Sequence, residues 1–90
     1  MESLENEPLP EQVIILIVRD QPGTLFQISA VFSNRGISMS SIQLHEESIP
    51  CNGKRCTRLI IRFFGEESRK KIIIRLLSRL DCVLESDDSG

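Results

Sequence analysis

The turn around Asp20 and Gly23 holds the residues of this chain whose types and spacing best suit binding of a small anion. The hydrophobic run of residues 13–18 ends just before it, and apolar residues at helical spacing begin at Leu25. A strand therefore leads into a helix, and the unpaired amide N–H groups of the helix start point into the turn. Gly23 has no side chain to block another molecule, so we expect this turn to bind a group such as a carboxylate.

Catalysis and metal binding have weaker support in the sequence. His45 is the only histidine, and it does not form an acid–base pair with Glu46, because neighbouring strand residues point to opposite faces. A metal site can be drawn from His45, Cys51 and Cys56, but it lacks the C-x-x-C spacing and a fourth ligand. We therefore expect no catalytic residue, no metal and no cofactor, and we interpret the chain as a binding or regulatory module rather than an enzyme.

Composition and charge point to a soluble cytoplasmic domain. The formal net charge of −2 argues against a nucleic-acid-binding protein, and neither a long apolar run nor a secretory signal pattern is present. Three cysteines without a signal sequence argue against a disulfide framework. We expect Cys56 and Cys82 at the edge of the core and Cys51 in a loop.

Six elements are expected to position the turn. Hydrophobic periodicity and turn residues predict strands over residues 12–19, 37–45, 56–64 and 82–85 and helices beginning at Thr24 and within residues 65–68. The first helix should end near Asn34, where Gly36 suits a left-handed cap. Its expected buried stripe is Leu25, Ile28, Val31 and Phe32.

Side-chain patterns also predict how the later elements face the core. The expected buried stripe of the second helix is Ile72, Ile73, Leu76, Leu77 and Leu80, with Lys70 among the solvated residues. A phase slip near Ser40 and Ser41 predicts a β-bulge in the second strand. In the third strand, Leu59, Ile61 and Phe63 form an apolar face, and Arg58 and Arg62 make the opposite face wetter.

This order of elements predicts an α+β, ferredoxin-like βαββαβ fold, in which a four-stranded antiparallel sheet carries both helices on one face. Residues 12–86 would form the domain, residues 1–11 a flexible arm or linker, and residues 87–90 a loose tail. The first strand is apolar on both faces, so we expect a homodimer or higher oligomer, formed edge to edge or face to face. An RNA-binding domain of this topology would need exposed aromatic residues, and the chain has no Tyr or Trp.

The motif at the turn resembles the ACT domain family, whose pattern is D-x-P-G-x-L, a helix, and then G-I-N-I. Here the two parts read Asp20-Gln21-Pro22-Gly23-Thr24-Leu25 and Gly36-Ile37-Ser38-Met39. The resemblance covers residues 13–85. It is strongest to the C-terminal ACT domain of homoserine dehydrogenases, followed by acetolactate synthase regulatory subunits and the (p)ppGpp synthetases.

The resemblance implies that the chain senses a small amino acid at a subunit interface. It would then allosterically control an amino-acid biosynthetic enzyme such as homoserine dehydrogenase, as an attached domain or a partner subunit. The implied ligand-binding residues are Asp20, Gln21, Pro22, Gly23, Thr24, Leu25, Ile37, Ser38 and Met39. Asp20 would accept from the α-ammonium group, and the amides of Thr24 and Leu25 would hold the carboxylate.

Two other interpretations remain open at the sequence level. Ser38 departs from the Asn of the family pattern, and its shorter side chain has fewer hydrogen-bonding groups. The turn can also be purely structural, with Asp20 capping the helix. The chain would then be a ligand-free dimerisation or protein-interaction module of the same fold.

Overall fold

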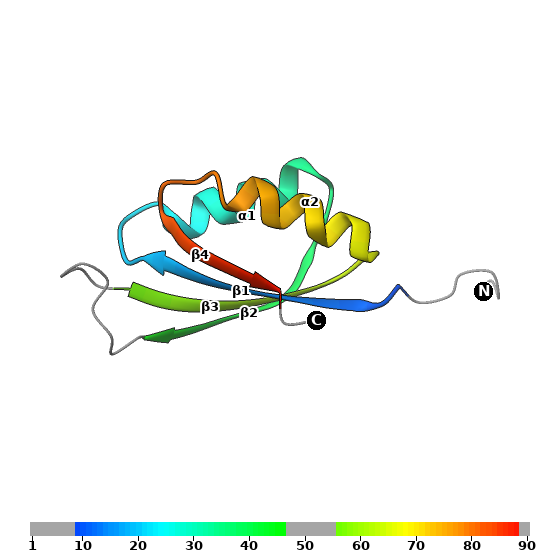
Figure 1. The fold of residues 1–90 in the computed structure, drawn as a ribbon, viewed down its shortest axis with the longest axis horizontal. Coiled ribbons are helices and arrows are strands. Elements are labelled where there is room, and N and C mark those ends of the chain that lie inside the picture. The colour runs from blue at the N-terminus through cyan, green and yellow to red at the C-terminus, as the bar shows by residue number, and fades with distance from the viewer. Residues whose placement is uncertain (1–8, 47–55, 89–90) are drawn as a thin grey trace.

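The computed structural model describes residues 9–46 and 56–88, which form a four-stranded antiparallel sheet with two helices on one face (Figure 1). The elements are β1 (Glu11–Arg19), α1 (Thr24–Asn34), β2 (Met39–Glu46), β3 (Cys56–Phe64), α2 (Glu67–Leu77) and β4 (Val83–Asp88). The strand order is β2-β3-β1-β4, so β2 and β4 are the edges of this sheet. The predicted ferredoxin-like fold is confirmed.

Strand boundaries differ from the prediction mainly in β4. This strand continues to Asp88, three residues beyond the predicted end, because its backbone pairs with β1 as far as Ile14. Backbone hydrogen bonds extend a strand without requiring apolar side chains. The polar residues at the end of β4 therefore gave no hydrophobic pattern from which this part of the strand could be predicted. The register of β2 against β3 shifts between Met39 and Ser41, which confirms the predicted bulge.

The core lies between the sheet and the helices. Every second residue over residues 14–18 of β1 and 59–63 of β3 is fully or almost fully buried there: Ile14, Leu16, Val18, Leu59, Ile61 and Phe63. The rings of Phe32 and Phe63 meet edge to face, with centroids 5.6 Å apart and an interplanar angle of 71°. This arrangement joins α1 to the central strand β3 and matches the geometry that aromatic pairs prefer.

Both helices are rotated relative to the predicted stripes. The buried residues of α1 are Thr24, Ile28 and Phe32, and those of α2 are Lys70, Ile73 and Leu77. Leu25 is 43% exposed, Ile72 is 40% exposed and Lys70 only 1%, so the predictions for these three residues are wrong. Neighbouring apolar residues leave the rotation of a helix undecided, and contacts with the sheet determine it. Neither helix of the described segments is long and apolar enough to cross a membrane.

The end of α1 follows the expected glycine cap. Gly36 adopts φ +70°, and its amide donates to the Ser33 carbonyl at 3.0 Å. The amide of Ile37 donates to the Phe32 carbonyl at 2.9 Å, which completes a Schellman motif. This cap directs the chain from the helix into β2.

The cysteines differ partly from expectation. Cys56 is buried and disulfide-bonded, a feature that the argument against a disulfide framework did not predict. Cys82 is a free, fully buried thiol whose Sγ donates to Gln27 Oε1 at 3.4 Å. Both residues are buried, and Cys82 belongs to the core itself rather than to its predicted edge. Cys51 and the rest of the segment 47–55 lie outside the described residues.

The Cys82 thiol should make stability fall at alkaline pH. Burial raises the pKa of this thiol, with a hydrogen bond to Thr24 acting in the opposite direction. The folded chain then holds the proton more tightly, so its contribution is present below the unfolded-state pKa of about 8.5 and is lost as pH rises above it. Urea unfolding from pH 7 to pH 10 should show a steeper loss for the wild type than for Cys82→Ser. Equal slopes would rule out this contribution.

Candidate functional site

The turn between β1 and α1 is held by its own hydrogen bonds. The Thr24 hydroxyl donates to the Arg19 carbonyl at 3.0 Å, and the Gln27 amide donates to the Gly23 carbonyl at 2.9 Å. Gly23, with φ +87°, is therefore the N-cap of α1, and the interpretation of Asp20 as the helix cap is wrong. Any side chain at position 23 would strain this left-handed backbone. Backbone conformation therefore explains the glycine better than the need to leave room for a ligand.

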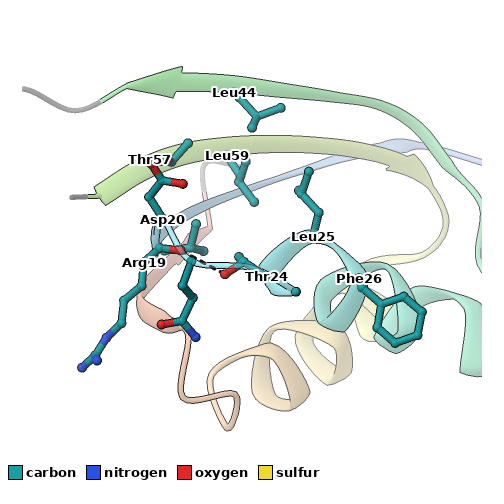
Figure 2. Close-up of a pocket in the computed structure, with 11 residues that line it drawn as sticks. Arg19, Asp20, Thr24, Leu25, Phe26, Leu44, Thr57 and Leu59 are labelled. Atoms are coloured by element: carbon teal, nitrogen blue, oxygen red, sulfur yellow. Dashed lines mark hydrogen bonds between the residues drawn. The ribbon is translucent and has the colours of Figure 1, made fainter. Parts of the chain in front are cut away.

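A cavity of about 270 Å³ lies between this turn and the sheet (Figure 2). The polar residues that line it are Arg19, Asp20, Gln21, Thr24 and Thr57, and the apolar ones are Val18, Leu25, Phe26, Leu44 and Leu59. Leu25 points toward Leu44 and Leu59 across the cavity in Figure 2, and the Phe26 ring points away. The size and the mixed lining suit a small molecule with polar and apolar parts.

The helix start adds hydrogen-bond donors on the turn side. The amides of Leu25 and Phe26 precede the first intrahelical bond of α1, whereas the Thr24 amide donates to the Gln21 carbonyl at 3.3 Å. These amides and the positive end of the helix dipole favour a negative group. The carboxylate of Asp20 on the same cavity favours a positive one. The cavity therefore combines features that suit a zwitterion.

The predicted site residues fall into two separate places. All those of the first group except Pro22 line the cavity: Asp20, Gln21, Gly23, Thr24 and Leu25. The second group, Ile37, Ser38 and Met39, lines another hollow beside Phe32 at the far end of α1. An eleven-residue helix is about 16 Å long, so one chain does not bring the two groups together.

Sequence reasoning missed the cavity residues that come from the sheet. Leu44 of β2 lies opposite Leu59 of β3, and Thr57 lies opposite Val18 of β1. The strands were predicted, but their register was not, and register decides which residues reach the turn. For Leu59, the alternation of apolar residues along β3 could have indicated that its side chain faces the helices.

The metal site drawn from the sequence includes Cys51, which lies outside the described residues. Within residues 9–46 and 56–88, no three His, Cys, Asp or Glu side chains gather in a way that would hold a metal ion. His45 is exposed on the edge strand β2.

This architecture is that of a small ferredoxin-like domain, with a small cavity at its first strand–helix turn. The family model of the ACT domain matches residues 12–80, and the chain belongs to this family. ACT domains are in general regulatory and non-catalytic. No curated protein matches the chain significantly.

Solved structures support the fold. The small subunit of acetolactate synthase from Thermotoga maritima is 24% identical, with a TM-score of 0.78 over 89% of this chain and 47% of that one. The ACT domain of GTP pyrophosphokinase from Chlorobium tepidum is 16% identical, with a TM-score of 0.64 over 90% and 97%. A homoserine dehydrogenase from Thiobacillus denitrificans is 16% identical, with a TM-score of 0.62 over 99% and 20%. The chain thus spans about half of the first protein and a fifth of the last.

Proposed function

We propose that this ACT domain binds a small amino acid between two copies of the chain in the cytoplasm. Binding would control an amino-acid biosynthetic enzyme, such as homoserine dehydrogenase, to which the domain is attached or bound. The cavity at the β1–α1 turn carries this proposal, because polar and apolar groups surround a volume of amino-acid size there. Similarity in fold to parts of two biosynthetic proteins adds support.

In this proposal, each part of an amino acid has a partner among the residues of the cavity. The Asp20 carboxylate accepts a charge-assisted hydrogen bond from the α-ammonium group. The amides of Leu25 and Phe26 hold the α-carboxylate at the positive end of α1. The ligand side chain faces the apolar wall formed by Leu25, Leu44 and Leu59.

A second copy explains how the two groups of predicted residues can form one site. β2 is an edge strand, and its Leu44 end borders the cavity. In an antiparallel pair of β2 strands, the beginning of one strand lies beside the end of the other. Met39 of the second copy, with Ile37 and Ser38 before it, would then lie next to the first copy's cavity.

Exposed apolar residues around the cavity favour a second candidate function, that of a ligand-free dimerisation or protein-interaction module. Phe26 is 78% exposed and Leu44 is 54% exposed, and both line the cavity together with Leu25. Contiguous exposed apolar side chains mark surfaces that bind other proteins. This function needs the surface but not the zwitterion-binding groups, so the two candidates separate by experiment.

Calorimetric titration with the twenty common amino acids should identify at least one that binds. The Asp20→Asn variant should bind that ligand about 10–100-fold more weakly, because a charge-assisted hydrogen bond is lost. Asp81→Asn is the matched control, since Asp81 is also exposed, does not line the cavity, and loses the same charge.

The titration also separates the two candidates. Heat from no amino acid, in a protein that still dimerises, would favour the ligand-free module. Equal affinity of Asp20→Asn and the wild type would contradict the assignment of the α-ammonium group to Asp20.

A further inference from the structure

A second cavity, of about 720 Å³, lies where α1 ends and α2 begins. This end of the helix layer is opposite to the end that carries the β1–α1 turn (Figure 1). The cavity is lined in part by charged, hydroxyl and aromatic residues: Arg35, Ser38, Phe64, Glu66, Ser68 and Arg69. It shares no residue with the cavity that we assign to the amino acid, so it is a separate place for a ligand.

Two arginines from different helices meet in this second cavity. Arg35 is the C-cap of α1, and Arg69 lies in the first turn of α2. Nη1 of Arg69 donates to the backbone carbonyl of Arg35 at 3.3 Å, which holds the Arg69 guanidinium at the cavity. A guanidinium carries several N–H donors in a fixed plane, so this bond leaves others for a ligand.

The positive charge of these arginines is not balanced by a nearby carboxylate. Within residues 9–46 and 56–88, neither guanidinium forms an ion pair, even with Glu66 on the same cavity. Both arginines are exposed, so they are accessible to a ligand from solution. An anion between them would relieve the repulsion of two like charges.

A phosphate monoester is the anion that suits two arginines best. Guanidinium groups match the oxygens of a phosphate with pairs of parallel hydrogen bonds. A single phosphate carries a charge of about −1.5 to −2 at neutral pH, which two guanidinium groups balance. A longer phosphate chain would bring more negative charge than these arginines balance, and Glu66 would repel the excess.

The other side chains of the cavity suit the nucleoside part of a nucleotide. Phe64 ends β3 and is 54% exposed, and exposed aromatic rings stack on nucleobases. The exposed Glu66 carboxylate is an acceptor for ribose hydroxyl groups, a role that acidic residues have in dinucleotide sites. The hydroxyl groups of Ser38 and Ser68 add donors for phosphate oxygens. The cavity volume is within the range of small-molecule sites.

We propose that this second cavity binds a nucleoside 5′-monophosphate. The phosphate lies between Arg35 and Arg69, the ribose lies beside Glu66, and the base stacks on Phe64. The site is complete within one chain, so it requires neither a second copy nor a bound amino acid. The domain would then respond to two chemically different ligands, one at each end of α1.

Calorimetric titration of the full chain with adenosine 5′-monophosphate and guanosine 5′-monophosphate tests this site. The wild type should bind at least one of them. Arg35→Gln and Arg69→Gln should each raise its dissociation constant about tenfold or more, because charge-assisted hydrogen bonds to the phosphate are lost. Arg79→Gln is the matched control, since Arg79 is also exposed, loses the same charge, and does not line the cavity. Circular dichroism verifies that each variant is folded.

Phe64→Ala distinguishes a nucleotide site from a site for phosphate alone. This variant should bind the nucleotide about fivefold or more weakly, because base stacking is lost, and should bind inorganic phosphate as the wild type does. Phe26→Ala, which removes another exposed ring at the first cavity, should change neither affinity.

Three results would overturn the proposal. These are no heat from either nucleotide, wild-type affinity for inorganic phosphate equal to that for the nucleotides, and a loss in Arg79→Gln as large as that in Arg69→Gln. The amino-acid titration has no bearing on any of them, so this site and the amino-acid site stand or fall separately.

Discussion

Phe63→Ala should lower the free energy of unfolding by about 3–5 kcal/mol, the usual cost of truncating a buried phenylalanine. Phe63 is fully buried on the central strand β3, and its ring contacts Phe32 of α1 edge to face. The substitution removes both the burial and the contact that joins the helix to the sheet. A small domain has only about 5–15 kcal/mol of stability, so the variant should be close to unfolding. Urea unfolding followed by circular dichroism measures the change.

Phe26→Ala is the matched control for this prediction. It removes the same atoms from a side chain that is 78% exposed, so the free energy of unfolding should change by about 0.5 kcal/mol or less. Equal losses in Phe63→Ala and Phe26→Ala would contradict the described core. Phe26→Ala also tests whether the exposed ring contributes to dimerisation without a change in stability.

Leu44→Asp should weaken both edge pairing and amino-acid binding if the site needs two copies. Leu44 lies on the edge strand β2, is 54% exposed, and lines the cavity. A carboxylate there would be buried against the second copy, so the dissociation constant of the edge dimer should rise about 100-fold. Folding should persist, because the side chain is already exposed. Light scattering and calorimetry on the same sample measure the two effects.

Ile72→Asp is the control for this second prediction. Ile72 is another exposed apolar residue, 40% accessible on α2, and lies away from the cavity and the β2 edge. This variant should keep both the wild-type mass and the wild-type affinity. Retention of ligand affinity by Leu44→Asp would show that one chain suffices for binding.

The fold was predictable because its signals are local and repeated. Alternation in β3, the continuous apolar run of β1 and the glycine after α1 each indicate one element, and together they define βαββαβ. The polar end of β4 was missed because it is stabilised by backbone pairing with β1. The phases of α1 and α2 were missed because Leu25 and Ile72 are as apolar as the residues that face the sheet.

Only the part of the candidate site that is continuous in sequence could be predicted. The turn from Asp20 to Leu25 is continuous in sequence, and its glycine and helix start indicate a binding feature. Leu44 and Thr57 reach the same cavity through the register of three strands, which a single sequence does not specify. Pairing of the turn with Ile37–Met39 depends on a second molecule, so it remains a prediction for the titration and light-scattering experiments.

The placement of these two segments at opposite ends of α1 has a consequence for regulation. If a bound amino acid must touch both, each ligand bridges two molecules, and its apparent affinity rises with the abundance of the protein itself. Dilution of the protein would then weaken ligand binding. A cell would set the amino-acid concentration to which the domain responds through its expression level, without altering any residue of the cavity.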